Sequence, residues 1–299
     1  MTTLAIDVGG TTVSAGLVTT DYTLVDHESI GFERGIPGLH RCIQTLQHWA
    51  NNRYTDVAIA TPGKLADDCR YRISPGSAEN LGVFLGEFDG FDWGKVAHSI
   101  FPNTPFFVEN DAIAQLIGGW QDYCPKATNG IGYIGPGTGL GGGFLRLSPT
   151  PSILGDGHIF DILLPKRSPD NESLSTVMAE DVISGRGFFD RYGRSFKDAT
   201  AANPSHPEIE QIAHYVVALI TQIKRGHVPK KNPQNQWDDS TITAISSIRT
   251  WLIGGGMGHR LFPLIQSKLN QKNHDDTLTL ITSPITAALK GVVYARNFR

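Results

Sequence analysis

The sequence is poor in cysteine, in long apolar runs and in excess charge of either sign. Its three cysteines, Cys42, Cys69 and Cys124, are scattered through 299 residues and form no C-x-x-C pair. This spacing predicts neither a disulfide framework nor a zinc knuckle. No apolar run approaches the length of a membrane span, and the first residues show no signal-peptide pattern. We therefore expect a cytoplasmic protein that does not cross a membrane.

The charge balance gives no sign of a nucleic-acid or membrane partner. The chain has 26 Lys and Arg residues against 29 Asp and Glu residues, for a net charge of -3. A nucleic-acid-binding or membrane-surface protein would show a basic excess, so neither partner is expected. The length fits two ordinary domains or one large one, and a hydrophobic fraction of 40% is enough for a core.

Glycine is abundant, with 33 residues, and much of it is clustered in three places. The first two clusters read as strand, turn and strand, and the third as a strand that breaks into a helix. This recurrence predicts two α/β halves around a cleft, with a boundary near Asn110. The clusters are DVGGTT at 7–12, GPGTGLGGG at 135–143 and LIGGG at 252–256.

Each glycine turn has two interpretations. It can be a plain hairpin, or it can present backbone N–H groups and Thr hydroxyls to phosphate oxygens. Asp7 can bond loop amides at its strand end, or hold Mg²⁺ through water. The third cluster can lie against a nucleotide, with phosphates near the helix N-terminus. The chain has no P-loop, and GPGTG at 135–139 precedes a strand rather than the helix of a dinucleotide fingerprint.

Asn110-Asp111 follows an expected strand at 106–108 and begins an expected helix at 111–120. In α/β sheets, ligands bind outside the carboxyl ends of strands. A carboxylate at such a junction can accept the proton of an attacking hydroxyl. The alternative is that Asn110 or Asp111 only caps the helix.

Taken in order, these motifs resemble those of sugar kinases in the actin/hexokinase ATPase superfamily. More narrowly, the chain is similar to bacterial glucokinases and the ROK (repressor, ORF, kinase) family over nearly its whole length. DVGGTT resembles the first phosphate motif, GPGTGLGGG the second and LIGGG the adenosine motif. The resemblance implies an α/β, two-domain actin-like (ribonuclease H-like) ATPase fold with a central cleft. It assigns residues 1–110 and a C-terminal helix at about 285–299 to a small domain, and residues 111–284 to a large one.

The resemblance also implies an activity: ATP- and Mg²⁺-dependent phosphorylation of a hexose, with glucose at its 6-hydroxyl as the first expectation and Asp111 as general base. A homodimer is the expected assembly. Asp7 would hold Mg²⁺ through water. The implied sugar contacts are Asn80, Asn110, Asp111, Asp156, His158 and Glu180. The implied phosphate and nucleotide contacts are Gly9, Gly10, Thr11, Thr12, Gly137, Thr138, Gly139, Gly254, Gly255 and Gly256.

The chain departs from the family pattern at one sugar loop. The family has Glu-x-x-His, whereas this chain has Asp156-Gly157-His158, with a shorter acid one residue closer. This leaves the sugar open and motivates an amino- or N-acetyl-hexose as an alternative. The zinc-binding cysteine cluster of many ROK proteins is missing from the sequence, so no zinc is expected. Without the resemblance, His158 is an ordinary loop or core histidine, and Glu180 a first-turn acid favoured by the helix dipole.

Two further alternatives concern the activity itself. The chain could use polyphosphate instead of ATP, or it could be a sugar-sensing regulator on the same fold. Against the regulator, the first expected strand begins within a few residues of Met1, where ROK repressors carry a DNA-binding helix-turn-helix.

The polar stretch 226–244 is expected to be a surface loop with Lys230-Lys231 at a solvated tip. The stretch 64–92 is expected to be irregular.

Overall fold

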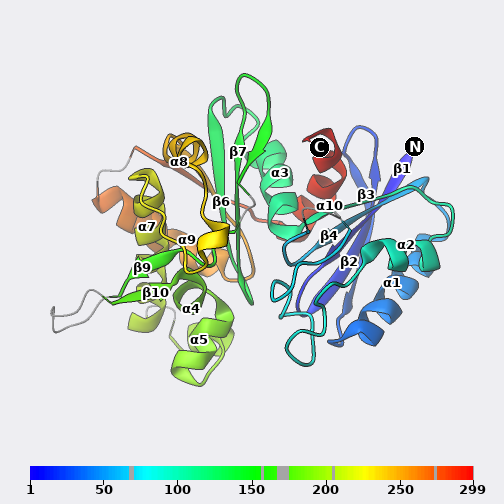
Figure 1. Ribbon diagram of the computed structural model, residues 1–299, viewed down its shortest axis with the longest axis horizontal. Helices are drawn as coiled ribbons and strands as arrows, with labels where there is room; N and C mark the ends of the chain where they lie inside the picture. The colour runs from blue at the N-terminus through cyan, green and yellow to red at the C-terminus, as the bar shows by residue number, and fades with distance from the viewer. Residues whose placement is uncertain (67–70, 156–157, 167–174, 204–205, 273–274, 299) are drawn as a thin grey trace. The chain divides into compact units, whose positions relative to one another are not determined.

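The computed structural model describes residues 1–66, 71–155, 158–166, 175–203, 206–272 and 275–298 (Figure 1). The chain forms two compact units. The first unit comprises Met1–Asp122 and Ser283–Arg299, and the second comprises Tyr123–Thr282. This division keeps the helix that follows Asn110 in the first unit, whereas the sequence-based division placed it in the large domain. Among the described residues, each unit is built on a five-stranded sheet.

The sheet of the first unit has the order β3-β2-β1-β4-β5. β1, β2 and β3 are antiparallel neighbours, and β4 and β5 run parallel to β1. The carboxyl ends of β1, β4 and β5 therefore meet at one edge, where Asp7 pairs in register with Ala60 and Thr61 with Asn110. The strands are β1 (Thr2–Val8), β2 (Thr12–Thr19), β3 (Leu24–Gly31), β4 (Asp56–Thr61) and β5 (Phe106–Asn110).

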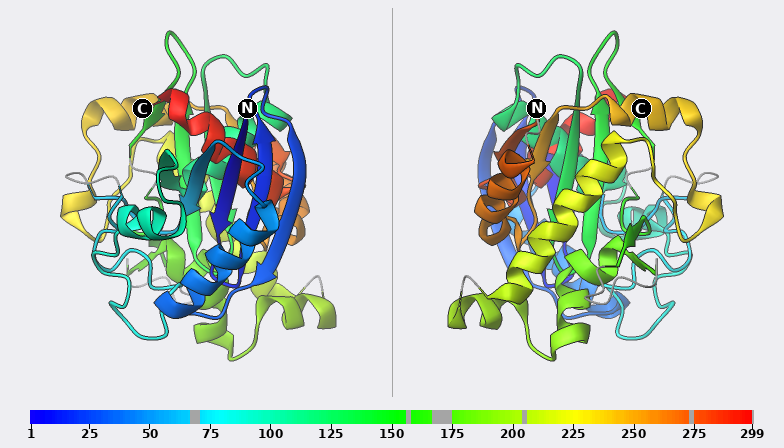
Figure 2. Two further views of the ribbon diagram at one scale, coloured as in Figure 1. Left: turned by 90° about the vertical axis from the view of Figure 1, so that its right-hand side faces the viewer. Right: turned by 90° about the vertical axis from the view of Figure 1, so that its left-hand side faces the viewer.

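Helices cover both faces of this first sheet, because the central strands β1 and β4 contain continuous apolar runs and successive side chains of a strand point to opposite faces. On one face Leu4 and Ile6 pack with α1 and α2, and on the other face Ala5 packs with α3 and α10 (Figure 2). Gly118 lets α3 approach α10 closely, since a methyl group there would lie 1.9 Å from the carbonyl oxygen of Ala287. The helices are α1 (Ile36–Ala50), α2 (Trp93–Ile100), α3 (Asp111–Tyr123), α10 (Pro284–Ala295) and η2 (Arg296–Phe298).

The second unit repeats this arrangement around another hairpin. Its sheet has the order β12-β11-β6-β7-β8; β6, β7 and β8 are antiparallel neighbours, and β11 runs parallel to both β6 and β12. A separate pair, β9 and β10, is antiparallel. The strands are β6 (Gly130–Pro136), β7 (Leu140–Arg146), β8 (Ser152–Leu154), β9 (Leu163–Pro165), β10 (Thr176–Met178), β11 (Thr250–Ile253) and β12 (Thr277–Leu280).

The core of the second unit is centred on the long helix α7, which packs with α9 and α4. Ile212, Val216 and Ile220 of α7 are fully buried. Phe144 of β7 contacts the edges of two tryptophan rings, Trp237 and Trp251. The helices are α4 (Ala179–Ile183), α5 (Gly185–Tyr192), α6 (Phe196–Ala202), α7 (Pro207–Lys224), η1 (Pro233–Asn235), α8 (Asp239–Ser246) and α9 (Gly258–Gln271).

The polar stretch 226–244 differs from its prediction. It contains η1 and the start of α8, and the side chain of Lys230 is fully buried rather than solvated. Lys231 is exposed, as expected. Lys230 can be buried because its ammonium group donates to the carbonyl oxygen of His158 (2.7 Å) and lies 3.6 Å from the carboxylate of Asp161.

The described parts of the stretch 64–92, residues 64–66 and 71–92, are irregular, as predicted, with isolated β-bridges in place of strands. The large apolar side chains described in this stretch include both buried and exposed ones. Phe88 is buried in the core of the first unit, whereas Val83, Phe84 and Leu85 are at least two-thirds exposed. The Glu87 carboxylate accepts bonds from the backbone N–H groups of Val83 and Ile36, and so fixes this turn to the start of α1.

Candidate active site

The first glycine turn joins β1 to β2. The backbone N–H of Gly9 donates to the carbonyl oxygen of Thr12 (2.9 Å), and Thr11 accepts from the backbone of Phe32 (3.0 Å). Gly10 faces Asn80, since a methyl group on Gly10 would lie 3.4 Å from the Asn80 side-chain nitrogen. The structure therefore brings a predicted sugar contact beside a predicted phosphate turn.

Asp7 and Asp111 are two carboxylates at the same edge of the first sheet. Burial raises the pKa of Asp7 to about 8, and the negative charge of Asp111 adds to the rise. Burial also raises the pKa of Asp111 to about 6, against the opposing effect of a 2.8 Å hydrogen bond from the backbone N–H of Ala112. The pair therefore lies in surroundings that favour protonation or a nearby cation.

Asn110 caps α3. Its side-chain oxygen accepts from the backbone N–H groups of Ala112 (3.0 Å) and Ile113 (3.2 Å). Its side-chain nitrogen donates to the carbonyl oxygen of Gly63 (3.0 Å), in the turn that follows β4. The capping alternative is thus what the structure shows for this residue, and any sugar contact would have to use its remaining hydrogen-bonding capacity.

Replacing Asn110 by Ala is expected to destabilise the first unit. The change removes the cap of α3 and the tie to Gly63, and loss of a helix cap typically costs about 0.5–2 kcal/mol. Urea denaturation followed by circular dichroism measures the change. Asn110→Ser, which can still cap, should recover most of the stability, and equal losses in the two variants would contradict a capping role.

The second glycine turn, between β6 and β7, is tied to the helices that follow. Gly137 donates from its backbone N–H to Gly139 (2.9 Å), and its carbonyl oxygen accepts from the N–H of Gly185 at the start of α5 (2.8 Å). The Glu180 carboxylate lies against this turn: a methyl group on Gly139 would be 3.0 Å from its Oε1, and the Leu140 N–H donates to it. Burial raises the pKa of Glu180.

The third cluster packs against the end of β6. Gly254 donates from its N–H to the carbonyl oxygen of Ile134 (3.1 Å). Gly255 has a positive φ of 69°, and a methyl group there would lie 2.3 Å from the carbonyl oxygen of Pro136, so only glycine fits. At Gly256 an added methyl group would meet nothing within 4 Å. Gly256 lies beside Gly137, so the structure brings the second and third clusters together.

His158 is buried in the second unit and packs edge-to-face against Phe160 at 5.2 Å. Its carbonyl oxygen accepts the hydrogen bond from Lys230. Asp156, the other predicted sugar contact of this loop, lies outside the described residues. Sequence reasoning missed two contacts of this unit, that of Lys230 with the His158 loop and that of Glu180 with the β6–β7 turn.

A divalent metal ion needs oxygen, nitrogen or sulfur ligands that converge on one point. In the part of the chain that the structure describes, no group of three or more His, Cys, Asp or Glu side chains could hold one. Asp7 fits the weaker requirement of Mg²⁺, which keeps most of its water shell and needs only one or two carboxylates. Burial and, to a smaller extent, the charge of Asp111 raise the pKa of Asp7, and a cation at this edge would offset both effects.

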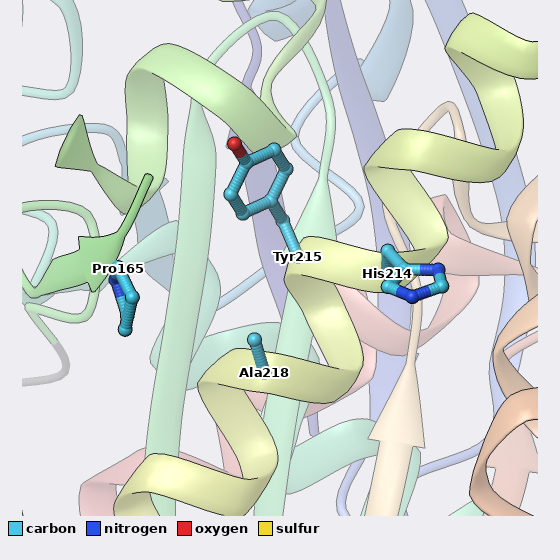
Figure 3. A pocket seen from close by; sticks show the side chains of 4 residues that line it. All are labelled: Pro165, His214, Tyr215 and Ala218. Carbon is cyan, nitrogen blue, oxygen red and sulfur yellow. The ribbon is translucent and has the colours of Figure 1, made fainter. Parts of the chain in front are cut away.

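A cavity of about 180 Å³ lies between β9 and α7 (Figure 3). Pro165 lies on one side, and His214, Tyr215 and Ala218 project from the helix. These lining residues offer no carboxylate and none is a predicted site residue, so the cavity is not assigned to the candidate site.

Among the described helices, none is long and apolar enough to cross a membrane.

Comparisons with known proteins identify relatives by sequence and by structure. No protein-family model matches the chain. It is 29% identical to the N-acetylmannosamine kinase of Shigella boydii serotype 18 over 239 residues, 75% of this chain and 79% of that kinase. It is 31% identical to the N-acetylmannosamine kinase of Escherichia coli O127:H6 over 196 residues, and the match spans 62% of each, less than two thirds of that kinase's length.

The solved structures that resemble the chain include a ROK family glucokinase from Streptomyces griseus in complex with glucose and AMPPNP. The TM-score is 0.70 with 17% identity, and the match covers 99% of this chain and 100% of that one. This likeness confirms the predicted α/β fold of the two-domain actin-like type. Together with the curated relatives it confirms the resemblance to ROK-type sugar kinases that the glycine motifs indicated.

Proposed function

We propose that this chain, which has the fold and the glycine motifs of ROK-type sugar kinases, transfers the γ-phosphate of ATP to a hydroxyl group of a hexose. The observation that carries the proposal is the placement of Asp111 at the strand edge that also bears Asp7. A general base works best when its pKa lies near the operating pH. Burial has moved the pKa of Asp111 to about 6, toward that range.

Asp111 accepts the proton of the attacking sugar hydroxyl in this proposal. Transfer of a phosphoryl group demands mostly positioning and charge neutralisation, with a carboxylate to receive the proton. The Ala112 N–H that bonds the Asp111 carboxylate fixes its orientation at the start of α3. Asn80 and Asn110 lie in the same unit, where they can contact the sugar near the first turn.

The two glycine turns and the third cluster hold the nucleotide. The N–H groups of Gly9 and Gly137 donate within their own turns, and the remaining backbone N–H groups of the turns at 9–12 and 137–139 are suited to phosphate oxygens. The open face at Gly256 leaves room for the nucleoside. Mg²⁺, held through water by Asp7, would supply the positive charge that neutralises the phosphates. The expected homodimer and cytoplasmic location stay predictions.

The three-glycine cluster offers a matched pair of variants. Gly256→Ala is expected to fold normally, because its methyl group meets open space, and to raise the KM for ATP without changing the KM for the sugar. Gly255→Ala should lower the thermal midpoint sharply, because its methyl group would collide with Pro136 and φ is positive. Thermal unfolding and steady-state kinetics measure both effects. An unchanged KM for ATP in Gly256→Ala would contradict the nucleotide role.

The acceptor has two candidates. Glucose is the first expectation from the motifs, and the Streptomyces griseus structure that resembles the chain is a glucokinase in complex with glucose. The curated relatives with about 30% identity are N-acetylmannosamine kinases, which favours an N-acetylated hexose as the second candidate. The shortened loop at residues 156–158 is a further reason to include it.

An assay of sugar-phosphate formation, with ADP release followed as well in the ATP reactions, tests the proposal. The panel comprises glucose, mannose, fructose, glucosamine, N-acetylglucosamine and N-acetylmannosamine, each with ATP and, in parallel, with polyphosphate. Turnover that requires ATP and one hexose supports the proposal and names the acceptor. Turnover only with polyphosphate would replace the donor, and none with any sugar would favour a sugar-sensing regulator.

A further inference from the structure

The ammonium group of Lys230 is the centre of a buried polar cluster in the second unit. Its Nζ donates to the carbonyl oxygen of His158 at 2.7 Å. It also lies 3.6 Å from the Asp161 carboxylate and 3.9 Å from the centre of the Trp237 ring. The side chains of Lys230 and Asp161 are 0% and 4% exposed, so these interactions are shielded from water.

The backbone around Lys230 is tied to the same loop. The backbone of Lys230 forms an isolated antiparallel β-bridge with that of Ile162. The N–H of Lys231 donates to the carbonyl oxygen of Asp161 at 2.9 Å. The side chain of Asn235 donates to the Asp161 carboxylate at 2.9 Å. The segment 229–235 is therefore fastened to residues 158–163, and Lys230 is the member that reaches His158 itself.

A buried ion pair is a costly way to stabilise a fold. The desolvation of two charges often cancels their attraction, and apolar side chains of similar volume often do as well or better. What an apolar side chain cannot do is donate to the His158 carbonyl oxygen. A charged donor makes a stronger and shorter bond than a neutral one, so it fixes this backbone position firmly.

We propose that Lys230 is a positioning residue for the acceptor site: its bond to the His158 carbonyl fixes the backbone that carries the imidazole, and thereby sets the affinity for the sugar. This inference rests on the proposed function and on the contact between His158 and the sugar that the resemblance to sugar kinases implies. Lys230 does not touch the substrate in this account. It acts through His158, and the nucleotide turns are independent of it.

Lys230→Met tests the proposal, because methionine keeps most of the length and the apolar stem but cannot donate. The KM for the accepted hexose should rise by about tenfold or more, as expected when a binding group is misplaced, while the KM for ATP stays unchanged. Lys231→Met is the matched control, since Lys231 is exposed and only its backbone contacts Asp161. Its two KM values should equal those of the wild type.

Two charge variants separate positioning from general stability. Asp161→Asn removes the charge partner but leaves the bond from Lys230 to His158, so the sugar KM should stay close to that of the wild type. The double variant Lys230→Met/Asp161→Asn carries no unpaired buried charge. Its thermal midpoint should therefore exceed that of Lys230→Met, while its sugar KM stays high. A sugar KM that rises equally in Asp161→Asn, or that is unchanged in Lys230→Met, would overturn the proposal.

A readout that needs no catalysis distinguishes this proposal from the proposed function. The imidazole resonances of ¹⁵N-histidine-labelled protein can be assigned to His158 by their loss in His158→Gln. In Lys230→Met this resonance should shift or broaden, and in Lys231→Met it should not. If the His158 resonance shifts in Lys230→Met but the wild-type protein phosphorylates no sugar, the positioning role stands and the proposed kinase activity is refuted. An unchanged resonance would refute the positioning even in an active kinase.

Discussion

Asp111→Asn is expected to lower kcat for sugar phosphorylation by about 10²–10⁴-fold, the usual contribution of a general base. The variant should still bind ATP, because the nucleotide contacts lie elsewhere in the proposal. Asparagine keeps the shape of the side chain at the start of α3 but cannot accept the proton. The matched control is Asp122→Asn at the other end of the same helix, where the carboxylate pairs with Lys290. That variant should retain full kcat.

The pH profile follows from the same residue. A base must be unprotonated to act, and burial raises the pKa of the Asp111 carboxyl from its ordinary 3.8 to about 6. At saturating Mg²⁺, kcat/KM should therefore fall as the pH drops through about 6, and not as it drops through 4. A profile that is flat down to pH 5, or high residual turnover in Asp111→Asn, would contradict its role as base.

Asp7→Asn is expected to abolish Mg²⁺-dependent turnover and, at the same time, to stabilise the protein. Burial and the charge of Asp111 raise the pKa of Asp7 to about 8, so the folded state holds a proton that the unfolded chain releases near pH 4. The stability contributed by that proton is complete below about pH 4, declines progressively as the pH rises, and is fully lost above about pH 8. At higher pH the ionised carboxylate of Asp7 destabilises the folded state, and a neutral asparagine removes that destabilisation.

The size of the effect can be bounded. One pKa unit corresponds to about 1.4 kcal/mol, so Asp7→Asn should raise the free energy of unfolding at pH 7 by up to about 4 kcal/mol. Because Asp111 contributes to the shift, the two carboxylates titrate as a pair and the gain can be smaller. Urea denaturation without Mg²⁺ at pH 5, 7 and 8 measures it. The gain should grow with pH in Asp7→Asn, and Glu28→Gln, an exposed carboxylate of β3, should show none. A loss of stability at every pH would contradict the account.

The fold was largely predictable because its signals are local. Apolar stretches on both sides of a glycine-rich turn indicate the strand–turn–strand pattern around the clusters at 7–12 and 135–143. The sequence placed Asp111 at a strand-to-helix junction, whereas the meeting of Asp7 and Asp111 at one edge emerged only with the strand order of the first sheet. A helix cap was one of the two roles that the sequence predicted for Asn110, because the residue lies directly before an expected helix.

The features that sequence reasoning missed depend on contacts between distant segments. Lys230 reads as a solvated charge because lysine is almost never fully buried unless paired. Its partners lie about the His158–Asp161 loop, far away in the chain. Glu180 likewise reads as a first-turn acid, and its contact with the Leu140 N–H exists only once α4 packs against the β6–β7 hairpin. No local pattern encodes either pairing.

The most direct test of the central claim is ³¹P NMR of a mixture of the protein, ATP, Mg²⁺ and each hexose in turn. The proposed function predicts a new phosphomonoester resonance, coupled to the protons on the sugar carbon that bears the phosphate, that appears together with ADP and does not appear with Asp111→Asn. ATP that is not consumed with any hexose, or that yields only ADP and inorganic phosphate, would contradict it.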